Sequence, residues 1–173
     1  MEILFTGVLV SDQKIPLYGR EDHKLIACLM RGAKSYAVPE GTEIIGDFAF
    51  NHFSGLKEVI FPDSLRAIEE FAFIHCEKLE SVSIPANVTA IGNNAFQGAS
   101  GLETVTLPDG LTDIGACAFS GCGRLPSVTI PDSVTNIGRS AFEWDTNLTL
   151  TVSRNSYAET YCKENGLKYA YAK

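Results

Sequence analysis

The sequence predicts a solenoid, in which one chain winds into stacked coils that share a parallel β-sheet. Five prolines recur at intervals of 23 residues, at Pro39, Pro62, Pro85, Pro108 and Pro131. The same interval repeats an isoleucine, an alanine, a phenylalanine and a leucine five times each, starting from Ile45, Ala49, Phe50 and Leu56, with no insertion or deletion. Such regularity is typical of arrays in which each repeat packs against its neighbours. We therefore expect five in-register 23-residue repeats whose equivalent residues stack in columns.

Each repeat begins with a short alternation of apolar and polar residues, which is typical of a half-buried strand. In Val59-Ile60-Phe61, we expect Val59 and Phe61 to point inward and Ile60 to point outward. Proline then ends the strand, because it cannot donate a hydrogen bond to a β-ladder. The pattern I-G-x-x-A-F follows, and one turn of helix there would aim its three apolar residues inward. We expect a parallel sheet on the concave face and short helical turns and loops on the convex face.

Both ends depart from the repeat, because each terminal coil of a solenoid has an otherwise exposed face. Leu17-Tyr18, a polar turn and the apolar run from 25 to 30 predict a β-hairpin. Near the other end, 156–159 is a capping box and Asn165-Gly166 is a helix stop, so a short helix and a last strand should close the core. The expected organisation is one continuous domain, with an N-terminal cap at 1–34, repeats at 35–148 and a C-terminal cap at 149–173.

Composition limits the classes of function. The 173 residues hold 45% hydrophobic residues, 21 acidic residues and 14 basic ones, for a formal net charge of -7. A surface of this sign repels phosphate, so we do not expect nucleic-acid binding. No apolar stretch is long enough to span a bilayer, so no membrane insertion is expected. The apolar residues 1–10 lack a positive n-region and a cleavage site, so we interpret them as a first strand and not as a signal peptide.

The residues Ile130 to Phe142 read I-P-D-S-V-T-N-I-G-R-S-A-F. This segment resembles the BspA-like subfamily of leucine-rich repeats, and the resemblance covers residues 35–148. It extends to the hairpin before Pro39 and to the closing segment from Ser156 to Gly166. The resemblance implies a leucine-rich-repeat solenoid, an α/β-type superhelix, from a bacterial surface or secreted protein. Some members of the subfamily bind host matrix proteins or other cells. The resemblance implies no catalytic motif and no cofactor.

A histidine pair is the strongest candidate for metal chemistry. His52 and His75 occupy the same position of neighbouring repeats, and Cys76 follows the second of them. Stacked side chains about 5 Å apart could in principle hold a metal ion. However, Cys76 shares its column with Phe53, Ala99 and Cys122, which favours burial of the thiol. We therefore expect no metal site, and a metal-binding protein using His52, His75 and Cys76 stays as an unfavoured alternative.

The five cysteines are an odd number in a chain of this length, which is not typical of a disulfide framework. Cys76 and Cys122 lie two coils apart, which places their Cα atoms about 9–10 Å from each other and beyond disulfide reach. We expect free thiols. Cys117 shares its column with Phe48, Phe71, Asn94 and Ser140, so we expect it to be half-exposed and the most reactive of the five.

The outward positions of the strands are the favoured binding surface, because the concave sheet is the usual contact surface of solenoids. Those predicted to bind are Glu58, Ile60, Ser81, Ser83, Thr104, Thr106, Ser127 and Thr129, with Ser35 and Ala37 at the N-terminal end. The alternative is that serine and threonine are simply good solvent-facing strand residues. An acidic row, Glu40, Asp63, Asp109 and Asp132, follows the strands and favours a basic partner, although turn preference alone explains aspartate after proline.

These observations predict a non-enzymatic protein-binding or adhesion module. Its partner would be a host or cell-surface protein, and the resemblance implies an extracellular or cell-surface location. No catalytic residue and no cofactor are expected. The alternative is a structural spacer, which would form one part of a larger surface protein whose binding site lies elsewhere.

Overall fold

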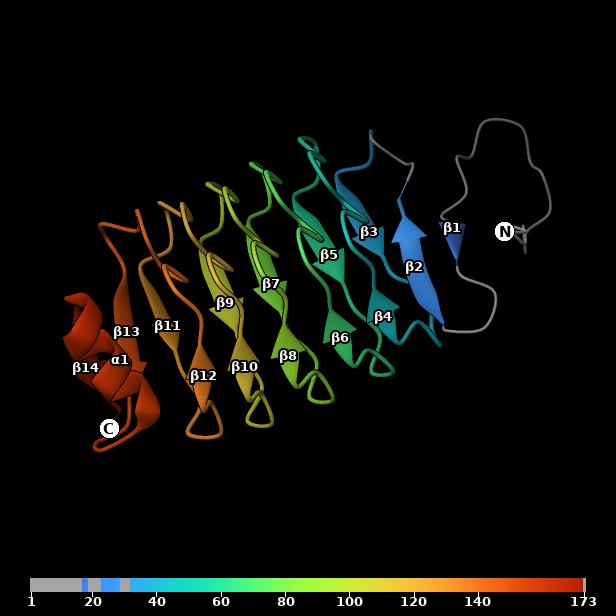
Figure 1. Ribbon diagram of the computed structural model, residues 1–173. Helices are drawn as coiled ribbons and strands as arrows, with labels where there is room; N and C mark the ends of the chain where they lie inside the picture. Colours follow the sequence, from blue (N-terminus) through green and yellow to red (C-terminus); the bar gives the residue numbers. More distant parts are fainter. Residues whose placement is uncertain (1–16, 19–22, 29–31, 173) are drawn as a thin grey trace, which may run out of the picture.

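A computed structural model of the protein describes residues 17–18, 23–28 and 32–172. They form an elongated solenoid in which each coil lies beside the next along one axis (Figure 1). The solenoid class predicted from the repeat is confirmed. The strand expected within residues 1–10 lies outside the described residues. No helix in the described ranges is long and apolar enough to cross a membrane.

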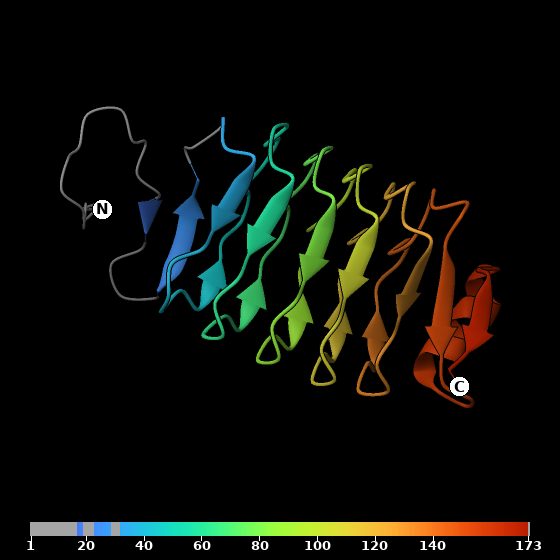
Figure 2. The same cartoon turned by 180° about the vertical axis from the view of Figure 1, so that it is seen from behind.

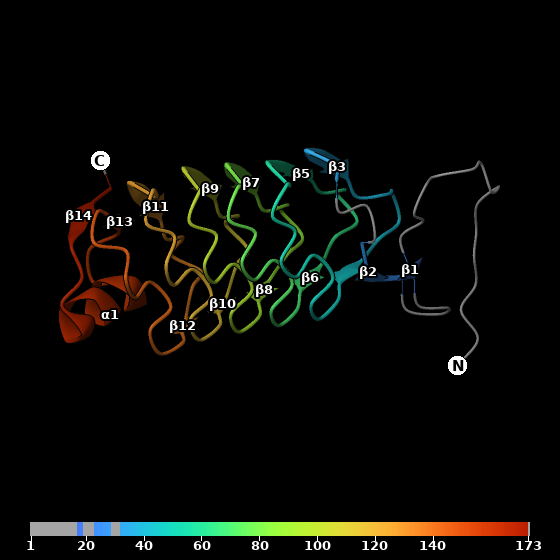
Figure 3. The same ribbon diagram turned by 90° about the horizontal axis from the view of Figure 1, so that it is seen from above.

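Two rows of parallel strands run along the solenoid, one row on each side (Figure 3). The first row is the predicted one, with β3 (Ser35–Ala37), β5 (Glu58–Ile60), β7 (Ser81–Ser83), β9 (Thr104–Thr106), β11 (Ser127–Thr129) and β13 (Thr149–Val152). The second row has β2 (Lys24–Ala27), β4 (Ile44–Ile45), β6 (Ala67–Ile68), β8 (Ala90–Ile91), β10 (Asp113–Ile114) and β12 (Asn136–Ile137). Figure 2 shows both rows from behind. Each row contains one strand more than the five predicted repeats.

The first row is divided between β9 and β11. The sheet order β3-β5-β7-β9 stops there, and a separate sheet β11-β13-β14 continues it, with β14 spanning Tyr169–Tyr171. In earlier coils the residue before the strand donates to the previous coil, as Glu103 N–H does to the carbonyl of Glu80 at 2.8 Å. Pro126 holds this position in the next coil and has no N–H to donate. The division therefore falls at the coil whose ladder lacks that hydrogen bond.

The repeated phenylalanines form the aromatic centre of the core. Phe73, Phe96 and Phe119 stack with ring centroids 5.1 and 5.3 Å apart and planes within 4° of parallel. All three side chains are fully buried, and the isoleucines, leucines and alanines of the other columns are at most 5% exposed. The stacking of equivalent residues, predicted from the 23-residue period, is confirmed.

The single helical turn predicted for the I-G-x-x-A-F segment is wrong. Each coil instead forms a two-residue strand of the second row and then a series of turns. The residue before the buried alanine is left-handed in every coil, with φ between 54° and 59° at Phe48, Phe71, Asn94, Cys117 and Ser140. A left-handed residue ends a right-handed helix, so the helical turn cannot form. The glycine of the motif permits close approach, since a Cβ on Gly115 would lie 2.5 Å from the Gly92 carbonyl carbon.

Both predicted closing structures are present. At the N-terminal end, β1 (Leu17–Tyr18) pairs antiparallel with β2. At the C-terminal end, α1 (Tyr157–Asn165) and β14 cover the last coil (Figure 1). Ser156 accepts a hydrogen bond from Glu159 N–H, and Gly166 ends the helix in a left-handed conformation with φ 66°. The helix stop and the Ser156 half of the capping box are confirmed, whereas the Glu159 carboxylate accepts from Asn155 N–H because Ser156 N–H donates to the Ser153 carbonyl oxygen.

Candidate functional site

The predicted binding positions lie on one surface, which we call the strand face. It comprises the outward side chains of β5, β7, β9 and β11: Glu58, Ile60, Ser81, Ser83, Thr104, Thr106, Ser127 and Thr129. All eight side chains are exposed, and Ser35 and Ala37 of β3 are exposed beside them. The middle residue of each strand points the other way, and Val59, Val82 and Val128 are buried. The period-two alternation thus predicted correctly which side chains face solvent.

The strand face is polar and almost featureless apart from one apolar residue. Ile60 is 53% exposed, and serine, threonine and alanine occupy the equivalent positions of the other strands. The Ser35 hydroxyl donates to the Glu58 carboxylate at 3.2 Å, which links the first two strands at this surface. Hydroxyl groups of this kind can form hydrogen bonds with the surface of a partner.

Two threonines extend the strand face beyond the predicted positions. Thr149 and Thr151 of β13 pair in register with Ser127 and Thr129 of β11, and both are half-buried. The predicted repeats end at Leu148, so these two threonines were not among the predicted positions. The signal was the alternation Thr-Leu-Thr-Val at 149–152, in which Leu150 and Val152 are buried.

The acidic row lies at the ends of the strands. Glu40, Asp63, Asp109 and Asp132 are all exposed, and each directly follows the proline that ends the strand segment. Equivalent positions of the coils place these carboxylates on one edge of the strand face, where Ala86 interrupts the row between Asp63 and Asp109. Exposed like charges of this kind attract a basic partner over a distance set by the ionic strength.

The His52, His75 and Cys76 corner does not form a three-ligand cluster. The two imidazole rings stack with centroids 4.9 Å apart and an interplanar angle of 25°. The Cys76 thiol is fully buried and donates to the Phe50 carbonyl oxygen at 3.1 Å. Burial raises the pKa of Cys76 to about 12, which opposes the thiolate that metal ligation needs. Across the described residues, no group of three His, Cys, Asp or Glu side chains is placed to hold a metal ion.

The cysteines differ in their access to solvent. Cys28, Cys76, Cys122 and Cys162 are buried, whereas Cys117 is half-buried, as its mixed column predicted. Burial also raises the pKa of Cys122 above its usual value and that of Cys162 to about 11. Burial and a raised pKa both lower the reactivity of a thiol, so the prediction that Cys117 reacts first remains consistent with the structure.

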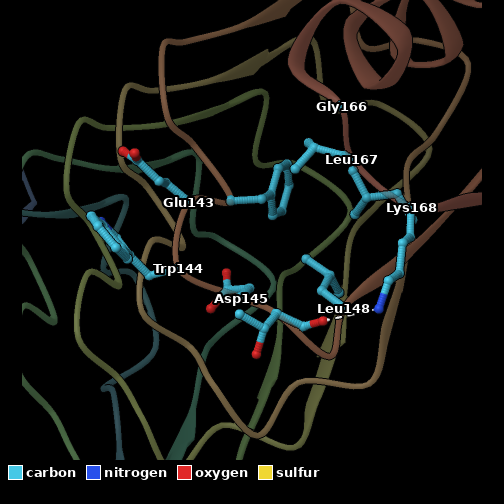
Figure 4. A pocket seen from close by; sticks show the side chains of 10 residues that line it. Glu143, Trp144, Asp145, Leu148, Gly166, Leu167 and Lys168 are labelled. Atoms are coloured by element: carbon cyan, nitrogen blue, oxygen red, sulfur yellow. Dashed lines mark hydrogen bonds between the residues drawn. The ribbon is translucent and has the colours of Figure 1, made fainter.

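Sequence analysis missed Asp145, a buried carboxylate in the last repeat. It occupies the column of Cys76, Ala99 and Cys122 and is only 9% exposed. Burial raises the pKa of Asp145 to about 7, against an opposing effect of the nearby Cys122 backbone N–H. The signal was an acid in a column that is otherwise apolar or thiol. It lines a pocket between the last repeat and the C-terminal cap (Figure 4).

Solved bacterial proteins share this fold. A leucine-rich repeat protein of T. pallidum is 22% identical, with a TM-score of 0.65 over 85% of this chain and 89% of that one. The pneumococcal vaccine antigen PcpA is 22% identical, with a TM-score of 0.74 over 91% of this chain and 46% of that one. A leucine-rich cell surface protein of Faecalibacterium prausnitzii is 18% identical, with a TM-score of 0.52 over 81% of this chain and 60% of that one. This chain thus spans about half the length of the latter two.

A comparison with curated protein sequences gives no match. The model of the BspA type leucine-rich repeat region, in contrast, matches residues 30–149 with six copies. Our count of five repeats was therefore one too low, and six strands in each row of the solenoid agree with the larger number. The 23-residue pattern does not reveal the sixth copy, because the coils at the ends lack the full set of repeated residues. With two thirds of its length matched and the repeat geometry in place, the chain belongs to the BspA-type leucine-rich repeat family.

Proposed function

We propose that the chain is a non-enzymatic binding module of a bacterial surface or secreted protein, and that a protein partner docks on the strand face. The observation that carries the proposal is the regular exposed row of short hydroxyl side chains on parallel strands, with one bulky apolar residue, Ile60, among them. Leucine-rich solenoids usually bind through such a sheet. The surface protein of F. prausnitzii supports a location at the cell surface.

Ile60 is the proposed anchor, because hot spots of protein interfaces are bulky residues surrounded by smaller contacts. Glu58 lies two residues before it on the same face, and the acidic row adds negative charge at the edge. A partner with a basic rim around an apolar hollow fits this arrangement. The charged edge would steer association, whereas Ile60 would slow dissociation.

The experiment has two stages. The purified chain is first used to capture partners from extracts of host matrix and cell-surface proteins, and binding of each captured protein is then titrated. Ile60→Asp should weaken binding at least tenfold, about 1.4 kcal/mol, with little change in the melting curve. The matched control is Ile26→Asp, because Ile26 is 42% exposed in the second row of strands. Raising the salt concentration should slow association more than it speeds dissociation.

A structural spacer is the second candidate, and one observation favours it. The chain spans only 46% of PcpA and 60% of the F. prausnitzii protein, so leucine-rich repeats of this type occur as parts of longer chains. The double variant Ile60→Asp, Thr106→Arg separates the two functions. If every captured protein binds this variant as well as it binds the wild type, the strand face has no partner and the spacer is the better description.

A further inference from the structure

Asp145 is placed where the other coils have apolar or thiol side chains. Cys76, Ala99 and Cys122 of the same column are fully buried, and Asp145 is 9% exposed. Both carboxylate oxygens expose less than 1 Å² and accept no well-formed hydrogen bond within the described part of the chain, because the nearby Cys122 N–H donates to the Phe119 carbonyl oxygen. A buried ionised carboxylate without a partner is strongly unfavourable, so a partner from outside the chain would relieve it.

A pocket of about 300 Å³ lies directly beside this carboxyl group. Its apolar walls come from Phe142, Leu148 and Leu150 of the last repeats and from Leu167 of the cap. In Figure 4, Glu143 and Trp144 lie on one side of the pocket, Leu167 and Lys168 lie on the other, and Asp145 lies between them. This volume is at the lower end for ligand pockets, which favours a group the size of one side chain.

The cap places one lysine at the wall of the pocket, and its ammonium group already has a hydrogen-bond partner. Lys168 lines the pocket, but its Nζ donates to the Thr146 carbonyl oxygen at 3.2 Å. No lysine or arginine of the described ranges forms an ion pair with Asp145. On the outer side, Trp144 is 76% exposed, and an indole face attracts cations. The pocket therefore combines an apolar interior, an unpaired carboxyl group and an aromatic rim.

We propose that this pocket binds an alkylammonium group, whose unbranched chain packs on Phe142, Leu148 and Leu167 and whose charge pairs with Asp145. Both carboxylate oxygens are buried in the free protein, so this pairing requires the Asp145 side chain to rotate toward the pocket. Either a small amine or a lysine side chain of a peptide carries this chemistry. The site is separate from the strand face, so it stands or falls independently of the proposed function.

Binding should also depend on pH. Burial raises the pKa of Asp145 to about 7, and the charged or titratable groups around it are Cys122 of the preceding coil, Glu143 of its own loop and Lys168 of the cap. An alkylammonium ion stays protonated across the neutral range and pairs only with the ionised carboxylate. Affinity should therefore rise about tenfold from pH 6 to pH 8, as the ionised fraction of a group with this pKa does.

Trp144 provides the readout, because it is the only tryptophan of the chain. Fluorescence is titrated with n-butylammonium and with 1-butanol, a neutral molecule of the same length. We expect saturable binding of the cation and at least tenfold weaker binding of the alcohol. Asp145→Asn should weaken cation binding at least tenfold, whereas Glu164→Gln, which removes an exposed charge of the cap outside the pocket, should change it less than about twofold.

Two further arms complete the test. In the first, Nα-acetyl-lysine methylamide is compared with its norleucine analogue to show whether the pocket also accepts a lysine side chain from a polypeptide. Binding of n-butylammonium without binding of the lysine derivative would indicate a small amine as the ligand. A ligand-induced rise in Tm that is present in the wild type and absent in Asp145→Asn supports the site without relying on fluorescence. No saturable response to n-butylammonium, or equal responses of wild type and Asp145→Asn, would overturn the proposal.

Discussion

The middle of the solenoid and its C-terminal end are built from the same repeat but differ in the side chains that they bury. Phe96 stacks between Phe73 and Phe119, at 5.1 and 5.3 Å, whereas Phe142 stacks only on Phe119 among the described residues, at 5.7 Å. In the middle, each buried position has an equivalent residue on both sides, and the phenylalanine, isoleucine, alanine and leucine columns repeat a single side chain. At the end, the outer neighbour is a helix, a strand or a pocket, and polar groups such as Asp145 and Glu159 enter the interior. Contact with a coil on each side thus favours a repeated side chain, whereas a coil that contacts only one other coil can bury a different side chain.

The largest expected effect comes from removing the outer neighbour altogether. A chain that ends at Leu148 lacks β13, α1 and β14, and therefore leaves β11 as an unpaired edge and the Phe142 coil uncovered. We expect this chain to aggregate or form higher oligomers, as measured by light scattering. A chain ending at Ala172 is the control and should stay like the full chain. If the shorter chain remains monomeric and melts unchanged, the end of the solenoid does not need its cap.

The next effect compares the same substitution in the two regions. Phe96→Ala should lower the free energy of unfolding by about 3–5 kcal/mol, because it opens a cavity between two stacked rings. Phe142→Ala should cost at least about 1 kcal/mol less, since Phe142 has one stacking partner and a pocket beside it. Denaturant melts measure both values. Equal losses would show that the end of the stack is as tightly constrained as its middle.

The sequence predicted the middle far better than the details that make the end distinctive. The columns, the strand face and the capping box follow from residues repeated at fixed intervals or from local hydrogen bonds, as at Ser156 and Glu159. The second row of strands was missed, because two residues such as Ile44–Ile45 are too few to show an alternation. Left-handed Phe48 and Cys117 were missed because such side chains rarely adopt φ above zero, and only packing between coils imposes it.

The pocket was missed for a different reason. Asp145, Leu148 and Leu167 meet there only because the cap folds back onto the last repeat, and no interval in the sequence reports that contact. The strand-face residues, in contrast, were predictable as exposed positions because alternation fixes their direction. Their role as a binding surface is still a proposal, since direction alone carries no information about a partner.

The third prediction uses pH to test the effect of the Asp145 carboxyl group, which replaces the apolar or thiol side chains of its column. Burial raises the pKa of Asp145 to about 7 in the folded protein from 3.8, so the unfolded chain releases its proton first as pH rises. The contribution of Asp145 to the unfolding free energy should therefore be highest below about pH 4 and fall until about pH 7, by roughly 2–4 kcal/mol. Asp145→Asn should remove this decline and stabilise the protein at pH 8. Denaturant melts between pH 4 and pH 8 measure it, with Asp132→Asn as the exposed control. A decline that persists in Asp145→Asn would assign it to other groups.

The smallest expected effect arises at Glu159 in the cap. Its contribution to stability rises with pH, whereas that of Asp145 falls with pH. The Glu159 carboxylate accepts hydrogen bonds from Lys163 Nζ at 2.7 Å, from the Tyr171 hydroxyl at 2.7 Å and from Asn155 N–H at 2.5 Å. The hydrogen bonds from Lys163 and Tyr171, and then that from Asn155, lower the pKa of Glu159 from 4.5 to about 2. This carboxylate therefore stabilises the folded chain above about pH 4.5, and the contribution is lost as pH falls toward 2.

Glu159→Gln keeps an oxygen that can accept a hydrogen bond but loses the charge, so it should lower stability modestly at pH 7 and have no effect near pH 2. Glu164→Gln on the exposed side of the same helix is the matched control and should be neutral. Together, the two acids predict a stability maximum near pH 4 to 5, with Glu159 responsible for the fall on the acid side and Asp145 for the fall on the neutral side. If the loss caused by Glu159→Gln is the same at pH 3 and at pH 7, it reflects packing of the cap and not charge. The fall in stability on the acid side would then need another cause, whereas the decline assigned to Asp145 on the neutral side would still stand, since it arises from a separate carboxyl group.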